Sequence, residues 1–452
     1  MSSNSLFDWT IYRHLFSAEA MERIFSEAAA LERMVAFERA VAKVQGEMGM
    51  IPEDAARQIV EKISAENLDL ERLRQDTLVV GRPVIGLVKQ LAEQAGEDSS
   101  QYVHYGMTTY DVMDTATVLQ VRDGLDEILA GVRRYRDGLK KLITDHRDTV
   151  MVARTINMHA LPTTFGAKLA NWLEEMLRNQ ERLQAARDRV LVVQLGGAVG
   201  TMASLNLNGL EFRAALAREL GLGTIKSNWH NARDSMSEVM LCLGNLCASL
   251  ARNAQNLSHL AGSDIGEVSE GGAVGYGRSS SMAHKRNPRA AEFAEATARL
   301  GRQRATGILD VMGQDHDRHG GTWIAEWMLV PETFLLTSGA LNWAVDLLQR
   351  LEVHSDKMLE NLNASQGLVL TERYTLVLAE KLGKAEARRL IDEACAVVLE
   401  TQSPLARVLL EMTEVRSVLR KEEIQALSDP RTYVGAAGEI VDAVLALNDD
   451  IE

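Results

Sequence analysis

Cysteine is scarce in this chain of 452 residues, and clustered metal ligands are not evident. Three cysteines, at 242, 247 and 395, are too few for a disulfide framework, and no Cys/His spacing suggests a metal site. Cys242 and Cys247 fall in a strongly apolar segment, so we expect them to be buried. The glycine-rich run 266–277 follows no strand pattern and is a poor nucleotide-binding fingerprint. We therefore expect no metal and no organic cofactor.

Proline is rare and long apolar runs are missing. The chain has 7 prolines, and none lies between Pro162 and Pro288, which predicts long uninterrupted helices there. No apolar run reaches the length that spans a membrane, and residues 1–10 have neither a basic start nor a hydrophobic stretch. We expect a cytoplasmic protein with no membrane partner.

Positive charge is also in deficit. The formal net charge is −14, from 49 lysines and arginines against 63 acidic residues. This balance argues against a nucleic-acid partner, which normally requires a basic surface. A protein this acidic must gather cations locally if its substrate is anionic.

What the sequence does contain is helical periodicity. The clearest signal is a heptad-like seam of apolar residues in 234–261, about four heptads long, with extra apolar positions that widen the stripe. Further long helices are predicted over 111–147, 163–193 and 288–313, and another after Pro331. An all-α fold built on a bundle of long helices is expected.

Glycine and proline punctuation divides the chain into three parts. We predict an N-terminal helical domain over 1–106, a central long-helix bundle over 107–365 and a C-terminal helical domain over 366–452.

The segment 277–288, Gly-Arg-Ser-Ser-Ser-Met-Ala-His-Lys-Arg-Asn-Pro, combines hydroxyls, cations and a helix start. Asn287 is a good N-cap, and Pro288 is tolerated in a first helical turn. The glycines before it leave the backbone free to move. This pattern predicts a mobile loop that closes over an anionic substrate.

Two other stretches carry candidate site residues. In 103–112, Thr108 and Thr109 stand where a long helix should begin, so their hydroxyls and free N–H groups could receive a carboxylate or simply cap the helix. The stretch 154–166 reads Arg-Thr-Ile-Asn-Met-His-Ala-Leu-Pro-Thr-Thr-Phe-Gly.

Together these stretches resemble the three signature regions of the fumarase/aspartase superfamily, with Arg278 and Ala283 replacing a loop Gly and Pro. The resemblance covers nearly the full chain. It implies a three-part all-α fold and a homotetramer whose active sites are shared between subunits. It also implies a small di- or tricarboxylate substrate, from which a proton is abstracted beside a carboxylate.

The resemblance also suggests site residues. Ser279 would be the general base, with His159 and His104 as further catalytic candidates. The remaining candidates would bind substrate: Thr108, Thr109, Ser280, Lys285, Asn287, Arg278 and Arg318. Two of these roles stay open, since Arg278 could point to solvent and Arg318 could be structural.

One departure from the family pattern bears on the reaction. Adenylosuccinate and argininosuccinate lyases have an acid histidine directly after the threonine that matches Thr155, and this chain has Ile156. An amine or alcohol leaves poorly without an acid, whereas a carboxylate, whose conjugate acid has a pKa of about 4, leaves unassisted. The bacterial 3-carboxy-cis,cis-muconate cycloisomerases, which also lack that histidine, are the branch that this sequence resembles most.

Two alternatives follow from the same residues. The chain could be a lyase that releases fumarate from a succinyl adduct, with His104, His159 or water as the proton donor. Arg278 and Ala283 could instead misplace the loop, as in a non-catalytic structural relative similar to the crystallins of this superfamily.

Overall fold

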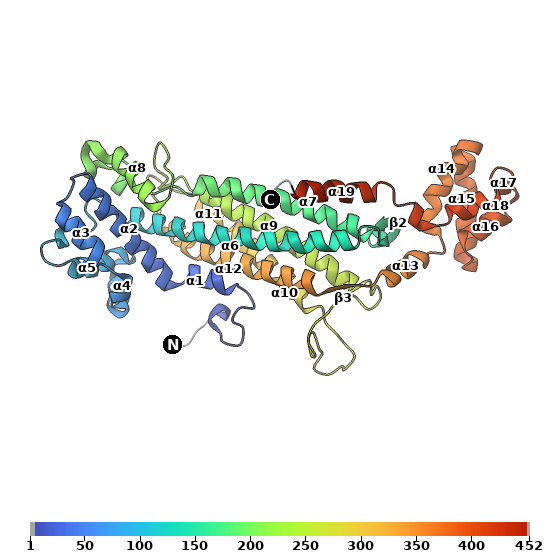
Figure 1. Cartoon of the computed structure of the whole chain (residues 1–452), viewed down its shortest axis with the longest axis horizontal. Helices are drawn as coiled ribbons and strands as arrows, with labels where there is room; N and C mark the ends of the chain where they lie inside the picture. Colours follow the sequence, from blue (N-terminus) through green and yellow to red (C-terminus); the bar gives the residue numbers. More distant parts are fainter. Residues whose placement is uncertain (1–4, 450–452) are drawn as a thin grey trace. The chain divides into compact units, whose positions relative to one another are not determined.

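The protein is all-α, with only short strands. The computed structural model describes the backbone of residues 5–449 and their side chains except at 206, 207 and 449. The α-helices are α1 Glu19–Ile24, α2 Glu27–Glu47, α3 Glu53–Lys62, α4 Leu70–Val80, α5 Val84–Ala95, α6 Thr109–Asp145, α7 Phe165–Val190, α8 Gly209–Leu220, α9 Asp234–Leu260, α10 Arg289–Thr306, α11 Ile308–Val311, α12 Gly320–Arg350, α13 Ser355–Asn363, α14 Thr371–Leu382, α15 Lys384–Thr401, α16 Leu405–Glu411, α17 Thr413–Arg416, α18 Lys421–Leu427 and α19 Ala437–Asp449 (Figure 1). The strands are β1 Val150–Thr155, β2 Met158–Thr164, β3 Val268–Glu270 and β4 Leu351–Val353.

The chain forms two compact units, each assembled from separated segments. The first comprises the described residues up to Val132 with Asn179–Ala251 and Phe293–Asn342. The second comprises Arg133–Arg178, Arg252–Glu292 and the described residues from Trp343 on. Helices α6, α7, α9, α10 and α12 each contribute residues to both.

The first unit is organised around the N-terminal helices. Helix α2 packs against α3 and α8, and α4 packs against α5. The core joins these helices to the start of α6 through side chains such as Phe37, Leu87, Val112 and Phe212, all fully buried. This packing fixes the N-terminal end of α6, which begins at Thr109, directly after Thr108.

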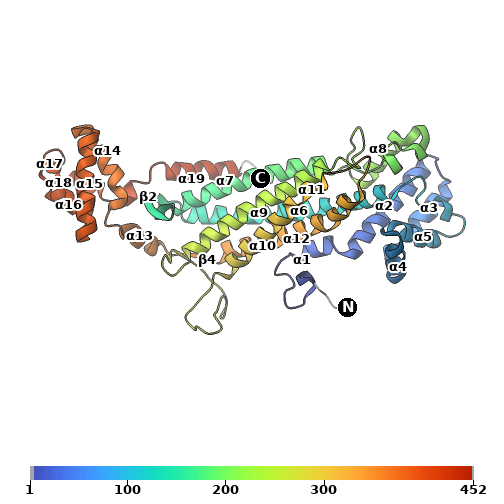
Figure 2. The same ribbon diagram turned by 180° about the vertical axis from the view of Figure 1, so that it is seen from behind.

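The second unit contains the C-terminal helices and two pairs of short strands. Helices α14, α15, α16 and α18 pack on one another around Leu378, Leu390 and Leu409 (Figure 2). Strand β1 pairs antiparallel with β2, and β3 pairs antiparallel with β4. Helix α13 packs against β1.

Most of the long helices expected from the sequence are confirmed. Helices α6, α7 and α9 begin and end within a few residues of the expected limits, and Cys242 and Cys247 are buried. The helix expected over 288–313 is interrupted at Gly307 and continues as the short α11.

The expectation that a helix begins after Pro331 is wrong. Helix α12 starts at Gly320 and runs through Pro331. Trp323, Val330 and Phe334, on both sides of the proline, are buried, so packing outweighs the local cost of a proline in the helix interior. None of the helices in residues 5–449 is both long and apolar enough to cross a membrane.

Candidate active site

The stretch 154–166 folds mainly as the β1–β2 hairpin. Thr155 pairs with Met158, which leaves Ile156 and Asn157 as a two-residue turn with φ of 52° and 64°. Two central residues with positive φ are typical of a type I′ turn, but a β-branched residue there is strained. Ile156 is 96% exposed. Ile156, which the resemblance matches to the acid histidine of the lyases named above, therefore lies at the tip of a hairpin.

A cavity of about 870 Å³ lies beside this hairpin, entirely within the second unit. Its lining includes Arg154 and His159 from the hairpin, Lys168 from α7, and His259 from α9. This volume is in the range of small-molecule sites.

An internal ion pair neutralises one of the cavity's cations. The two terminal nitrogens of Arg154 donate to the Glu267 carboxylate at 2.6 and 2.9 Å, and Asn361 Nδ2 donates to the same carboxylate at 2.9 Å. Glu267 is fully buried, so it is paired as a buried charge must be.

Two other basic side chains of the cavity, His159 and Lys168, have no carboxylate among the described residues paired with them as Arg154 has. Burial, followed by the Arg154 charge, lowers the pKa of His159. The same two causes, in the same order, lower the pKa of Lys168. The lining also contains Asp264, which is exposed. Such a cavity favours a bound carboxylate, which would offset the repulsion among its cations.

The segment 271–288 extends from β3 as a loop closed at its neck by the backbone (Figure 1). Asn287 N donates to the Gly277 carbonyl at 2.8 Å, and Arg278 and Arg286 form an isolated bridge. Gly277 has φ of 62°, and a Cβ there would overlap the Asn287 carbonyl oxygen. The neck therefore requires glycine at this position.

Ser279 lies just beyond that neck. Its Oγ accepts the backbone N–H of Met282 at 3.1 Å and that of Ser281 at 3.4 Å. Two N–H donors aimed at one hydroxyl oxygen favour negative charge on it. This geometry suits a serine that acts as a base.

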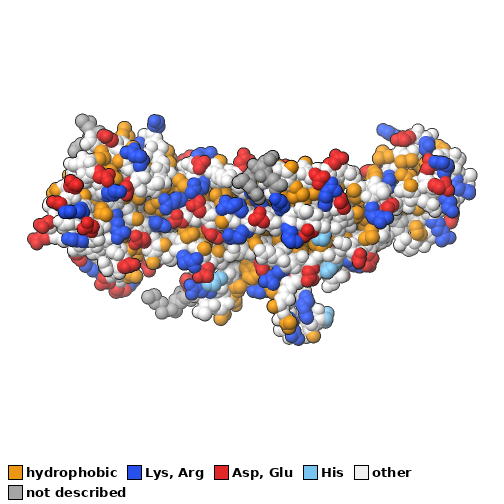
Figure 3. Space-filling model, viewed as in Figure 1, with side chains coloured by type: hydrophobic (Ala, Val, Ile, Leu, Met, Phe, Trp, Pro, Cys, Tyr) orange, Lys and Arg blue, Asp and Glu red, His pale blue; other side chains and the backbone are white. Residues whose placement is uncertain are grey.

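The tip of the loop carries the other candidates. Ser280 and Lys285 are exposed, Arg278 is exposed at the neck, and Asn287 is half-buried at the loop's end. Figure 3 shows Lys, Arg and His side chains on this projecting loop. In this chain the loop therefore offers its cations to solvent.

The base of the loop is held by a residue that sequence reasoning missed. The Glu270 carboxylate accepts the backbone N–H groups of Ala290 and Ala291 at 2.8 and 2.9 Å. The expectation that the Asn287 side chain caps α10 is wrong here, since the capping carboxylate comes from β3 instead. Tyr276 Oη also donates to Glu270, at 3.2 Å.

The first unit holds His104 and the start of α6. His104 Nδ1 lies 2.6 Å from Glu38, which is buried. Asp111, also buried, accepts the backbone N–H of Thr108 at 3.1 Å and that of Gly196 at 2.9 Å. Helix α6 begins at Thr109, so both threonines stand at its N-terminus as expected.

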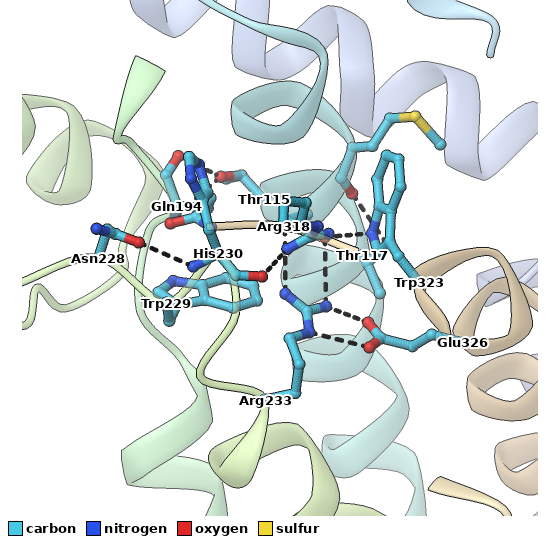
Figure 4. Close-up of polar contacts among 12 residues, drawn as sticks. Thr115, Thr117, Gln194, Asn228, Trp229, His230, Arg233, Arg318, Trp323 and Glu326 are labelled. Atoms are coloured by element: carbon cyan, nitrogen blue, oxygen red, sulfur yellow. Dashed lines mark hydrogen bonds and ion pairs between the residues drawn. The ribbon is translucent and has the colours of Figure 1, made fainter. Parts of the chain in front are cut away.

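Arg318 belongs to a buried charge network in the same unit. It lies 3.0 Å from Asp114 and donates to the His230 carbonyl, and its guanidinium stacks on Trp323 at 4.6 Å. Arg233 contacts Asp114 and Glu326 and faces the ring of Trp229 (Figure 4). The position of Arg318 in this network accounts for its charge without a substrate.

The structure thus distributes the candidates between its two units. The first unit holds His104, Thr108, Thr109 and Arg318. The second holds the loop residues and His159. Lys168, Glu267 and Glu270 were not singled out from the sequence, although the apolar context of Lys168 on α7 was a signal that it would be partly buried. Within residues 5–449, no group of three His, Cys, Asp or Glu residues is placed to hold a metal.

Known proteins are similar to this chain over almost its whole length. A family model described as lyase matches residues 12–300, and one described as adenylosuccinate lyase C-terminus matches residues 367–444. A 3-carboxy-cis,cis-muconate cycloisomerase of Acinetobacter baylyi is 36% identical, over 96% of this chain and 98% of its own length. An N-acetyl-S-(2-succino)cysteine lyase of Dickeya dadantii is 35% identical, over 99% and 98%. The crystal structure of a fumarate lyase from Mesorhizobium sp. BNC1 superimposes with a TM-score of 0.89 at 41% identity, covering 95% of this chain and 98% of that one.

Proposed function

This chain belongs to the fumarate lyase superfamily of enzymes, and we propose that it is a cycloisomerase acting on 3-carboxy-cis,cis-muconate or a close relative of it. The observation that carries this choice is Ile156 at the tip of the β1–β2 hairpin. A site without an acid at this position suits a leaving group that needs no proton, and an internal carboxylate is such a group.

The reaction assigns Ser279 a proton-transfer role. In the ring-opening direction, its alkoxide removes the proton from the carbon beside a carboxylate, and the C–O bond of the lactone breaks to release the internal carboxylate. In the lactonising direction, that carboxylate oxygen bonds to the adjacent alkene carbon and Ser279 returns the proton. The backbone donors at its Oγ support the alkoxide form.

The other candidates bind the substrate's charge. Thr108, Thr109, Lys285 and Asn287 receive the carboxylate on which negative charge builds, with Ser280 and Arg278 beside it. His159 and His104 would provide proton transfer if the substrate required it.

The assembly and location are proposed from the family. We propose a homotetramer in the cytoplasm, with each active site drawn from several subunits. Exposed apolar residues on the long helix α12, among them Ile324 at 46% and Met328 at 64%, support burial of this helix against other copies. The three-part division at 106 and 365 stays our proposal for how the domains are organised in that tetramer.

A lyase that releases fumarate from a succinyl adduct is the second candidate. The observation that favours it is the similarity to the N-acetyl-S-(2-succino)cysteine lyase, at nearly the same identity as to the cycloisomerase. A thiolate is also a weakly basic leaving group, so Ile156 is compatible with that chemistry.

The deciding experiment compares the two substrate classes with one enzyme preparation. Loss of the diene absorbance of 3-carboxy-cis,cis-muconate, without fumarate from succinyl adducts, would support the cycloisomerase. Fumarate from an S- or N-succinyl compound, with the muconate untouched, would contradict it and establish the lyase.

A further inference from the structure

Lys168 is a partly buried cation with little compensation. It lies on the first turns of α7 and lines the cavity of the second unit. Its Nζ donates to Asn256 Oδ1 at 3.3 Å and lies 5.6 Å from the centre of the Trp172 ring. Within the described part of the chain, no carboxylate lies within ion-pair distance of Nζ.

The charges around Lys168 are mostly of its own sign. Burial lowers the pKa of Lys168, and Arg154 and Arg252 lower it further. Glu267 acts in the opposite direction, but its two oxygens are already engaged by Arg154 and Asn361. A lysine ammonium has three donors, so at least one is available to a ligand in the cavity.

We propose that Lys168 is the cation that binds a substrate carboxylate remote from the carbon that loses its proton. This inference rests on the proposed function, because it places the additional carboxylate of a di- or tricarboxylate in the cavity beside the hairpin. The neighbouring His159 and His259 offer further donors to the same group. Since Asp264 lies in the same lining, a single carboxylate is favoured there over a more highly charged anion.

The proposal is tested by direct binding, independent of turnover. Propane-1,2,3-tricarboxylate is an unreactive probe, and its affinity can be measured by titration calorimetry for the wild type and for Lys168→Met. Loss of a hydrogen-bonded charge contact should weaken binding about 10- to 100-fold. Lys141→Met is the matched control, since Lys141 is on the exposed surface of the same unit and pairs with Asp145. This control should bind as the wild type does.

The outcomes separate this proposal from the proposed function. If Lys168→Met binds the probe as tightly as the wild type, or if the wild type does not bind it, the carboxylate role is wrong. If the wild type leaves the muconate unchanged but binds the probe through Lys168, the carboxylate-binding role of Lys168 is supported and the cycloisomerase assignment fails. Lys168→Gln, which keeps a polar end, provides the same measurement should the methionine variant fail to fold.

Discussion

The buried Glu267 carboxylate holds both terminal nitrogens of Arg154, at 2.6 and 2.9 Å, and thereby ties the hairpin to the segment that leads into the loop 271–288. The arginine is 17% exposed and the glutamate is not exposed at all. Arg154 lines the proposed substrate cavity, and Glu267 is its buried partner.

We predict that Arg154→Met destabilises the protein by about 3–5 kcal/mol, because it leaves the Glu267 charge buried and unpaired. Replacing both partners, as Arg154→Met with Glu267→Met, should recover most of that loss. Urea unfolding of the two single variants and the double variant measures the coupling. A double variant whose loss equals the sum of the two single losses would show that the two residues are not coupled.

The long helices could be predicted from the sequence, but the turn of the hairpin that carries Arg154 could not. Helix α9 could be predicted because its apolar period repeats along the whole element, and Met240, Leu243 and Leu250 are indeed fully buried. The turn at Ile156 could not, because it has no glycine and places a β-branched residue at positive φ. Capping of α10 by Glu270 also could not be predicted from the sequence. Glu270 accepts the N–H groups of the first turn of α10, and it lies 20 positions before the first of these residues, Ala290.

We predict that Gly277→Ala reduces activity by about tenfold or more with little loss of overall stability. The added Cβ would collide with the Asn287 carbonyl and open the neck of the loop, which displaces Ser279. Gly275→Ala is the matched control, because Gly275 also has positive φ but an added methyl group there would have no neighbour within 4 Å. Steady-state rates of the two variants test this, and equal rates would contradict the role of the neck.

We predict that Glu270→Ala destabilises the fold by about 0.5–2 kcal/mol, the usual effect of losing a helix cap. The reason is the loss of the carboxylate that receives the N–H groups of Ala290 and Ala291. Glu352→Ala, which removes an exposed carboxylate from the adjacent strand, should have a smaller effect. Chemical unfolding midpoints of the two variants measure this difference. A Glu270 variant as stable as the wild type would show that Glu270 does not cap α10.

We predict that the stability of the folded protein depends on pH through His104. Burial lowers the pKa of His104, but the Glu38 carboxylate and Asp111 outweigh burial and raise the pKa above its ordinary value of 6.5. The folded state therefore favours protonated His104. This stabilisation is fully present below pH 6.5 and is lost as the pH rises through the raised pKa of the folded state.

The variant His104→Gln should remove that pH dependence. The free energy of unfolding of the wild type should exceed that of the variant by the largest margin near about pH 6, and the margin should shrink toward about pH 9. Urea unfolding across this range measures it. A margin that grows with pH would mean that His104 is held neutral in the folded protein.

The central claim is that Ser279 transfers the proton in a reaction whose leaving group is a carboxylate. The most direct test is the rate at which 3-carboxy-cis,cis-muconate loses its diene absorbance with the variants Ser279→Ala and Ser281→Ala. We predict a fall of about 10²–10⁴-fold for Ser279→Ala and a rate within about threefold of the wild type for Ser281→Ala. An active wild type whose Ser279→Ala variant keeps more than about a tenth of the rate would contradict the account.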